Sequence, residues 1–264
     1  MEWFIAYAGI GAAVGFFAGL LGIGGGAIMV PMLVLALGAQ GIPKEHVLHL
    51  AVGTSMATIL FTSISSVRSH MKRGPLRWDI VRGMTPGILA GGLAGSAIAG
   101  VIPTRLFALI FVATVYAAAT NILLDRKPNP ARPLPGGLGL FAAGFTISAV
   151  SAFAAVGGAF MTIPFLLFCN VPMLGAIGAA AAIGFPISVA GTVGFVASGL
   201  HEGGLPAWSL GYVYLPALAG IVVASMLMAP VGVAVAHRVP IKVLKRAFAL
   251  LLFAFATRML VSFW

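Results

Sequence analysis

Long apolar stretches with almost no charge inside them dominate this sequence. The 264 residues are 61% hydrophobic and only 8% charged, whereas a soluble domain carries about 25% charged residues. Ten apolar stretches can be drawn, at 3–20, 27–38, 46–67, 79–100, 104–124, 137–155, 159–170, 173–199, 207–236 and 247–263. Their length and their Ala, Leu and Gly content indicate helices, because a membrane β-barrel would show short alternating segments. We therefore expect an all-α polytopic membrane protein.

The two halves of the chain carry the same landmarks in the same order. Three spacings between landmark residues occur once in each half: Gly25–Pro31 and Gly158–Pro164, Trp78–Pro86 and Trp208–Pro216, and Pro103–Thr120 and Pro240–Thr257. A segment rich in proline, glycine and charge separates the halves, as is typical of a linker. The sequence thus predicts a first transmembrane repeat at 1–124, a linker at 125–136 and a second transmembrane repeat at 137–264.

Basic residues indicate how the two halves are oriented. If each glycine-broken region is a single crossing, the 15 Lys and Arg residues split nine to six between the two faces. If each region is a hairpin that enters and leaves on one side, twelve of these residues fall on one face of the membrane and only Lys44, Arg105 and Arg258 on the other. Cytoplasmic loops carry an excess of Lys and Arg, which favours the hairpins. We expect two inverted repeats of about five segments each, counting each broken hairpin as two segments, with both termini outside the cytoplasm.

Glycine-rich breaks stand at the same place in each half, before the segments 27–38 and 159–170. At 1.5 Å per residue these segments are about 18 Å long, short of the ~30 Å hydrocarbon core. Short, glycine-interrupted segments at matching places point to the binding site of a transporter. Backbone N–H groups at such breaks can bind an anion; the glycines expected to expose them are Gly24, Gly25, Gly26, Gly157 and Gly158. Close helix packing through small residues is the alternative interpretation.

Hydroxyl side chains are the polar groups left within the apolar stretches. None of the five carboxylates lies in the middle of a stretch, which disfavours cation transport. We expect Thr54, Ser55, Ser151 and Ser188 to donate hydrogen bonds to a bound oxyanion, the alternative being a bond to a carbonyl of the same helix. Histidines near segment ends, such as His49, are expected to be interfacial rather than catalytic. The sequence holds no nucleotide-binding loop, nucleophile triad or metal-ligand set within the apolar stretches, so neither an enzyme nor a cofactor is expected.

The glycine breaks also carry a family resemblance. The run G-L-L-G-I-G-G-G-A-I-M-V-P-M-L at 19–33, with A-V-G-T-S at 51–55, resembles the TauE/SafE family of membrane proteins. A-V-G-G-A-F-M-T-I-P-F-L at 155–166 is similar to the second copy of the motif in that family. The resemblance implies export or uptake of sulfur-containing anions such as sulfite or organosulfonates. It places the first break at Gly22 and Gly24–Gly26. This chain departs from the pattern where Phe185–Pro186 follows Gly184, so the two halves of the site need not be equivalent.

These features predict a secondary transporter that moves sulfite, or an organosulfonate such as sulfoacetate, by alternating access. The alternatives are an anion channel, uptake of another oxyanion such as thiosulfate, a membrane-embedded enzyme, and a structural subunit. The expected partners are a small anionic substrate and the lipid bilayer, and the small-residue faces are compatible with a homodimer. We attribute the net charge of +10 to basic cytoplasmic loops, not to nucleic acid binding. A multi-pass protein of the bacterial cytoplasmic (inner) membrane is expected.

Overall fold

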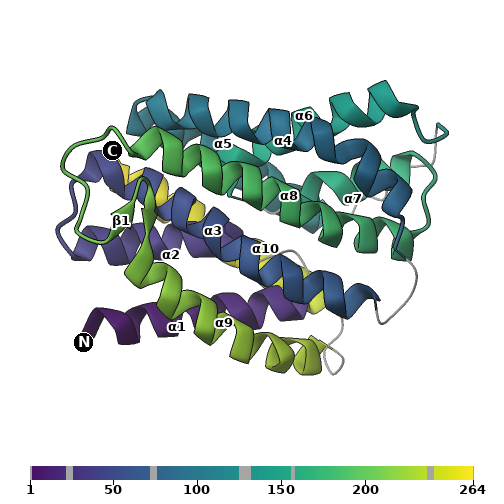
Figure 1. The fold of residues 1–264 in the computed structure, drawn as a ribbon. Coiled ribbons are helices and arrows are strands. Elements are labelled where there is room, and N and C mark those ends of the chain that lie inside the picture. Colours follow the sequence, from purple (N-terminus) through teal and green to yellow (C-terminus); the bar gives the residue numbers. More distant parts are fainter. Residues whose placement is uncertain are drawn as a thin grey trace.

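The computed structural model of the protein is almost entirely helical (Figure 1). It describes residues 2–21, 26–71, 76–124, 132–155, 158–236 and 241–263. The helices within these ranges are α1 (Glu2–Leu21), α2 (Gly26–Ala39), α3 (Lys44–Met71), α4 (Trp78–Val101), α5 (Thr104–Leu124), α6 (Gly137–Ala154), α7 (Ala159–Phe168), α8 (Met173–Gly199), α9 (Leu215–Ala236) and α10 (Ile241–Phe263). The strands β1 (Ser209–Leu210) and β2 (Val213–Tyr214) form an antiparallel hairpin before α9.

Seven of the described helices are long and apolar enough to cross a membrane by length and composition: α3, α4, α5, α6, α8, α9 and α10. The expectation of an all-α polytopic membrane fold is therefore confirmed. The helices α2 and α7 have only 14 and 10 residues, which makes them about 21 and 15 Å long. Each follows a helix that ends a few residues earlier, α1 at Leu21 and α6 at Ala154. The short segments predicted after the glycine breaks are thus short helices.

The ninth apolar stretch differs from its prediction, because residues 207–214 are not helical. They include the β1–β2 hairpin, and α9 begins only at Leu215. Gly211 has φ 54, a left-handed conformation that glycine adopts without steric cost. Pro216 then falls in the first turn of α9, where its missing N–H would have no helical acceptor. The hydropathy of this stretch hides the turn, because its residues are apolar on both sides of Gly211.

Glycines allow two pairs of helices to pack with their backbones in contact. On α1, Gly11 and Gly15 lie against the backbone of Ile221 and Ser225 of α9. On α4, the glycines at 87, 91 and 95 lie against the backbone of α6 at 141, 145 and 149. A Cβ built at residue 95 would stand 2.6 Å from the carbonyl oxygen at residue 149, too close for a real side chain. Glycines at every fourth position let membrane helices approach in this way.

The helix α3 runs through the centre of the bundle and contacts α2, α8 and α9. Of the 18 most apolar consecutive residues of α3, 78% are buried, whereas only 28% of the corresponding residues of α9 and of α10 are buried. Both chain termini lie at the end of the bundle that holds β1 (Figure 1). At the opposite end, Gly175 of α8 packs on the side chain of Arg77, and the backbone N–H of Arg132 donates to the carbonyl of Phe168 at the end of α7.

Candidate functional site

The two helix breaks meet inside the bundle. Gly26, the first residue of α2, lies against the carbonyl oxygen of Ala155, which directly follows α6. A Cβ at residue 26 would overlap that oxygen and would also stand 3.0 Å from Cδ1 of Ile59 on α3. Ala155 itself has φ 48, a left-handed conformation that residues other than glycine rarely adopt. Of the predicted glycines, Gly24, Gly25 and Gly157 lie outside the described residues.

Gly158 stands at the start of α7 and packs against α8. It has φ 71 and ψ −19, with no side chain capping the helix. A Cβ at this position would overlap Cδ1 of Ile187. The carbonyl of Gly158 accepts hydrogen bonds from the N–H groups of Met161 and Thr162, at 3.1 and 2.8 Å. The first N–H groups of α7 have no helical acceptor and carry the partial positive charge of a helix N-terminus.

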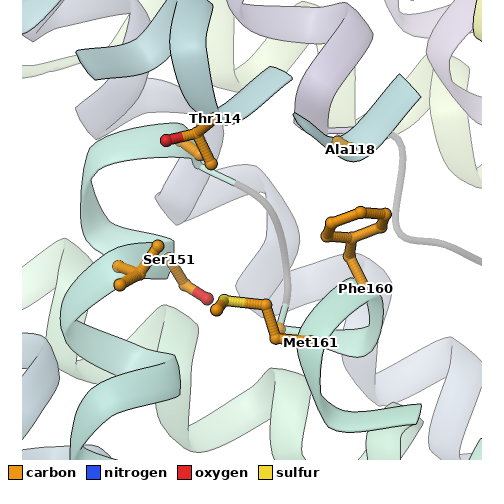
Figure 2. A pocket seen from close by; sticks show the side chains of 8 residues that line it. Thr114, Ala118, Ser151, Phe160 and Met161 are labelled. Atoms are coloured by element: carbon orange, nitrogen blue, oxygen red, sulfur yellow. The ribbon is translucent and has the colours of Figure 1, made fainter. Parts of the chain in front are cut away.

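A small cavity lies beside the second break (Figure 2). It is lined by Thr114 and Ala118 of α5, Val150, Ser151 and Ala154 of α6, Gly158, and Phe160 and Met161 of α7. In Figure 2 the hydroxyl of Ser151 is directed toward the side chain of Met161. The cavity measures about 10 Å³, close to the smallest volume that holds one water molecule. In this conformation the cavity has no room for a larger solute.

The four predicted hydroxyl donors differ in their hydrogen bonds. Ser55 and Ser151 are 0% and 3% exposed, and neither hydroxyl bonds another described residue. The Thr54 hydroxyl accepts from the backbone N–H of Tyr214 at 3.0 Å. The Ser188 hydroxyl donates to the carbonyl of Phe185 at 2.8 Å, which occupies its only proton. Ser55, Ser151 and Thr54 therefore keep a proton that a ligand could accept, and the Thr54 hydroxyl is also held by the hairpin.

Ser55 and Ser188 hold equivalent positions in the two halves, each 24 residues after the proline of its short helix. Ser55 lies one turn before Ile59, on the same side of α3. Because Ile59 contacts Gly26, this side of α3 faces the first break. Ser188 follows Ile187, which contacts Gly158 at the second break. Ser55 thus lies on the side of α3 that faces the first break, and Ser151 lines the cavity beside the second, whereas Thr54 bonds the hairpin.

Two further buried hydroxyls near the second break are not among the predicted donors. Ser148 of α6 and Thr162 of α7 are both 0% exposed, and neither has a hydrogen-bond partner within the part of the chain that the structure describes. A buried hydroxyl without a partner costs about 1–3 kcal/mol. Ser148 lies three residues before Ser151, and its hydroxyl lies against Gly92 of α4; the spacing to Ser151 is the sequence signal that could have selected it. No group of His, Cys, Asp and Glu in the described ranges could hold a metal ion.

Together these observations define the class of protein: a polytopic α-helical membrane protein in which two short helices begin at adjoining breaks. The chain belongs to the sulfite exporter TauE/SafE family, whose sequence profile matches residues 7–259. The resemblance inferred from the glycine motifs is therefore confirmed.

Relatives from distant organisms match most of the chain. A probable membrane transporter protein from Haemophilus influenzae is 34% identical over 258 residues, which cover 96% of each chain. The probable membrane transporter protein YdhB from Bacillus subtilis is 24% identical over 251 residues, covering 90% of this chain and 92% of its own. One from Methanocaldococcus jannaschii is 26% identical over 214 residues, covering 78% of this chain and 76% of its own. No solved structure is significantly similar to the chain.

Proposed function

We propose that this membrane transporter moves small sulfur-containing anions, sulfite or an organosulfonate such as sulfoacetate, by alternating access around the meeting point of the two breaks. The contact between Gly26 and Ala155 carries the proposal. It brings the start of α2 next to Ala155 at the end of α6, four residues before α7 begins at Ala159. Two helix N-termini in one region attract a negative charge without a fixed cation. The description of the family supports a sulfur-containing anion.

The proposed site consists of the backbone N–H groups at Gly24–Gly26 and at Gly157–Gly158, together with hydroxyls from α3 and α6. Ser55 and Ser151 are the proposed side-chain donors because their hydroxyls have no partner among the described residues. Thr54 contributes by holding α3 to the hairpin at Tyr214. Ser188 can donate to an anion only after it releases the carbonyl of Phe185. The two halves of the site are therefore unequal in donors.

We also propose two inverted repeats, residues 1–124 and 137–264, joined by the linker 125–136. The packing of the helices supports this. The first helix of each half packs on the fourth helix of the other half, α1 on α9 and α6 on α4, so the contacts are preserved when the two halves are exchanged. The helices α3 and α8 contact each other, as do α5 and α10. We place the end with Arg77 and Arg132 in the cytoplasm of a bacterial cell, by the positive-inside rule. Both termini then lie outside, across the inner membrane.

Anion uptake into liposomes tests the proposed transport. Purified protein is assayed with sulfite, sulfoacetate, thiosulfate, phosphate and acetate, and with monovalent cations. We expect saturable uptake and counterflow for the sulfur-containing anions, because a transporter exposes its site to one side at a time. A channel would show neither saturation nor counterflow. Uptake of cations alone, or of no anion in the panel, would contradict the proposal.

A matched pair of serine variants tests the site. Ser151→Ala removes a hydroxyl that lines the cavity and bonds no other described residue, so thermal stability should change little. Affinity for the transported anion should fall about tenfold to 150-fold, the loss of one hydrogen bond to a charged group. Ser225→Ala is the control, because Ser225 is 1% exposed and its hydroxyl donates to Val222 within α9. Equal anion affinity in both variants would remove Ser151 from the site.

A further inference from the structure

His49 is a buried titratable side chain that the proposed anion site does not use. It lies in α3 and is only 4% exposed, so its side chain is buried among helices rather than placed at the membrane interface as the sequence suggested. Its Nδ1 lies 3.2 Å from the carbonyl oxygen of Glu45, and its Nε2 lies 3.1 Å from the carbonyl oxygen of Ala99. Ala99 belongs to the last turn of α4, so the ring connects α3 with the end of α4. An ionisable side chain inside a membrane span marks a candidate functional site.

Two carbonyl oxygens suit a protonated imidazole better than a neutral one. A neutral ring has one N–H and can donate to one of the two oxygens, while its other nitrogen turns a lone pair toward the second. A protonated ring has two N–H groups and can donate to both. The carbonyl of Ala99 has no helical donor, because the residue four positions later is Pro103, which lacks an N–H. It also lies at the negative end of the α4 dipole, which favours a cation.

Aromatic rings enclose His49 on two sides. Its ring centroid lies 5.0 Å from that of Phe107 on α5 and 4.9 Å from that of Tyr212 in the β1–β2 hairpin. The ring of Tyr212 is stacked on the imidazole at an interplanar angle of 29°. Aromatic faces attract cations, most strongly where water is excluded. These contacts offset part of the cost of burying the charge that a bound proton brings.

Few other titratable groups face this ring. On α3 they are Glu45 and His46, whose side chains lie 3.6 Å apart, and a protonated His46 would repel a proton on His49. The hairpin contributes Tyr212, and the carboxylate of Glu202 lies near its hydroxyl. Burial and this carboxylate raise the pKa of Tyr212 to about 12. Arg105, on the same helix as Phe107, is exposed. The last turn of α4 and the whole of α8 contain no titratable residue, so the titratable neighbours of His49 come from α3, α5 and the segment between α8 and α9.

The stretch of α3 that carries His49 also contacts the hairpin before α9. One turn further along, Gly53 lies against the carbonyl oxygen of Tyr212. Thr54 accepts a hydrogen bond from the N–H of Tyr214, and the unpartnered hydroxyl of Ser55 follows directly. We expect a shift of α3 at His49 to move the hairpin and Ser55 as well, because these contacts lie on the same helix. This links the histidine to the proposed anion site through one rigid helix.

We propose that His49 is a proton-binding site that couples proton movement to anion transport. The inference rests on the proposed transport function. A proton from the aqueous phase, at the end of the bundle where the termini lie, binds the free ring nitrogen. The imidazolium then donates to the carbonyls of both Glu45 and Ala99 and holds α3 against the end of α4. Release of the proton from Nε2 removes the bond to Ala99, which joins α3 to α4, and frees α3 to shift.

Titration of His49 without substrate tests the site directly. In protein with isotope-labelled histidine, the His49 signal is assigned by its absence in His49→Gln and followed by NMR from pH 5 to pH 8, around the ordinary histidine pKa of ~6.5. We expect a reversible change to a ring with protons on both nitrogens at the acidic side. A ring that keeps one charge state over this whole range would overturn the proposal, whichever state it is.

Transport under a pH gradient tests the coupling, with an alkanesulfonate as substrate because it stays ionised over this range. For one coupled proton we expect uptake to change by up to about tenfold per pH unit. His49→Gln keeps an N–H donor but cannot titrate, so it should lose this dependence while still binding the anion in a thermal-shift assay. His201→Gln, an exposed histidine after α8, should keep it.

The two proposals fail in distinguishable ways. Anion uptake by the wild-type protein that is independent of pH, or a His49→Gln variant that retains the pH dependence, overturns the coupling and leaves the transport function standing. Reversible titration of His49 in a protein that carries no anion supports the proton site and overturns the transport function.

Discussion

The carbonyl oxygen of Ala155 lies directly against Gly26, so the end of α6 touches the start of α2. No side chain separates the two breaks at this point. The residues are 129 positions apart in the sequence, and each belongs to a different glycine-broken region. Glycine is required at residue 26 because any Cβ would overlap a backbone atom, which cannot move aside as a flexible side chain can.

Replacement of this glycine should therefore separate the breaks. Gly26→Ala is expected to lower the free energy of unfolding by about 1–3 kcal/mol, the cost of overpacking, and so to lower the unfolding temperature. It should also reduce anion uptake. Gly38→Ala on the same helix is the control, because a Cβ there has no neighbour within 4 Å. It should be neutral or stabilising by up to about 1 kcal/mol, since alanine favours helix more than glycine does. Equal thermal stability and uptake in the two variants would show that the breaks are not in contact.

The contact between α1 and α9 leads to a second prediction. A Cβ at Gly15 would overlap the backbone of Ser225, whereas one at Gly9 would meet nothing within 4 Å. Gly15→Ala should therefore destabilise the protein by about 1–3 kcal/mol, and Gly9→Ala should not. Thermal unfolding in detergent, followed by tryptophan fluorescence, measures both variants. If Gly15→Ala unfolds at the wild-type temperature, α1 and α9 do not pack through their backbones.

The hydrogen bond between Thr54 and Tyr214 gives a third prediction. Thr54→Val keeps the shape of the side chain but leaves the N–H of Tyr214 without its acceptor, at a cost of about 1–3 kcal/mol. Thr54→Ser keeps the hydroxyl and should retain most of the stability. The free energy of unfolding of the three proteins distinguishes the effects. A valine variant as stable as the serine variant would mean that this bond does not hold the hairpin to α3.

The proposed orientation in the membrane gives a fourth prediction. Cys169 is the single cysteine of the chain, so Cys169→Ala provides a background without thiols. In it, Leu174→Cys at the start of α8 and His201→Cys after its end place thiols at exposed positions. In intact cells, a membrane-impermeant maleimide should label the variant at 201 and not the one at 174. The opposite pattern would reverse the orientation, and labelling of both would contradict a membrane span at α8.

The helical membrane fold, the short helices and the family could all be predicted from the sequence. These depend on local properties: a run of apolar residues must form a helix in lipid to satisfy its backbone, and clustered glycines weaken such a helix. They do not always interrupt it, because α4 continues through the glycines at 87, 91 and 95. The ninth stretch shows the limit of this reasoning. Its hydropathy continues through residues 207–214, and only the structure reveals the hairpin that Gly211 permits.

The roles of individual polar groups were decided by the tertiary structure alone. Ser55 and Ser188 follow their prolines at the same distance, yet one hydroxyl has no partner among the described residues and the other donates to its own helix. His49 lies near a segment end in the sequence but is buried, because α4, α5 and the hairpin close around it. Local sequence determines which segments enter the membrane. Which polar atoms meet depends on contacts between residues far apart in the chain, and these exist only once the helices have packed.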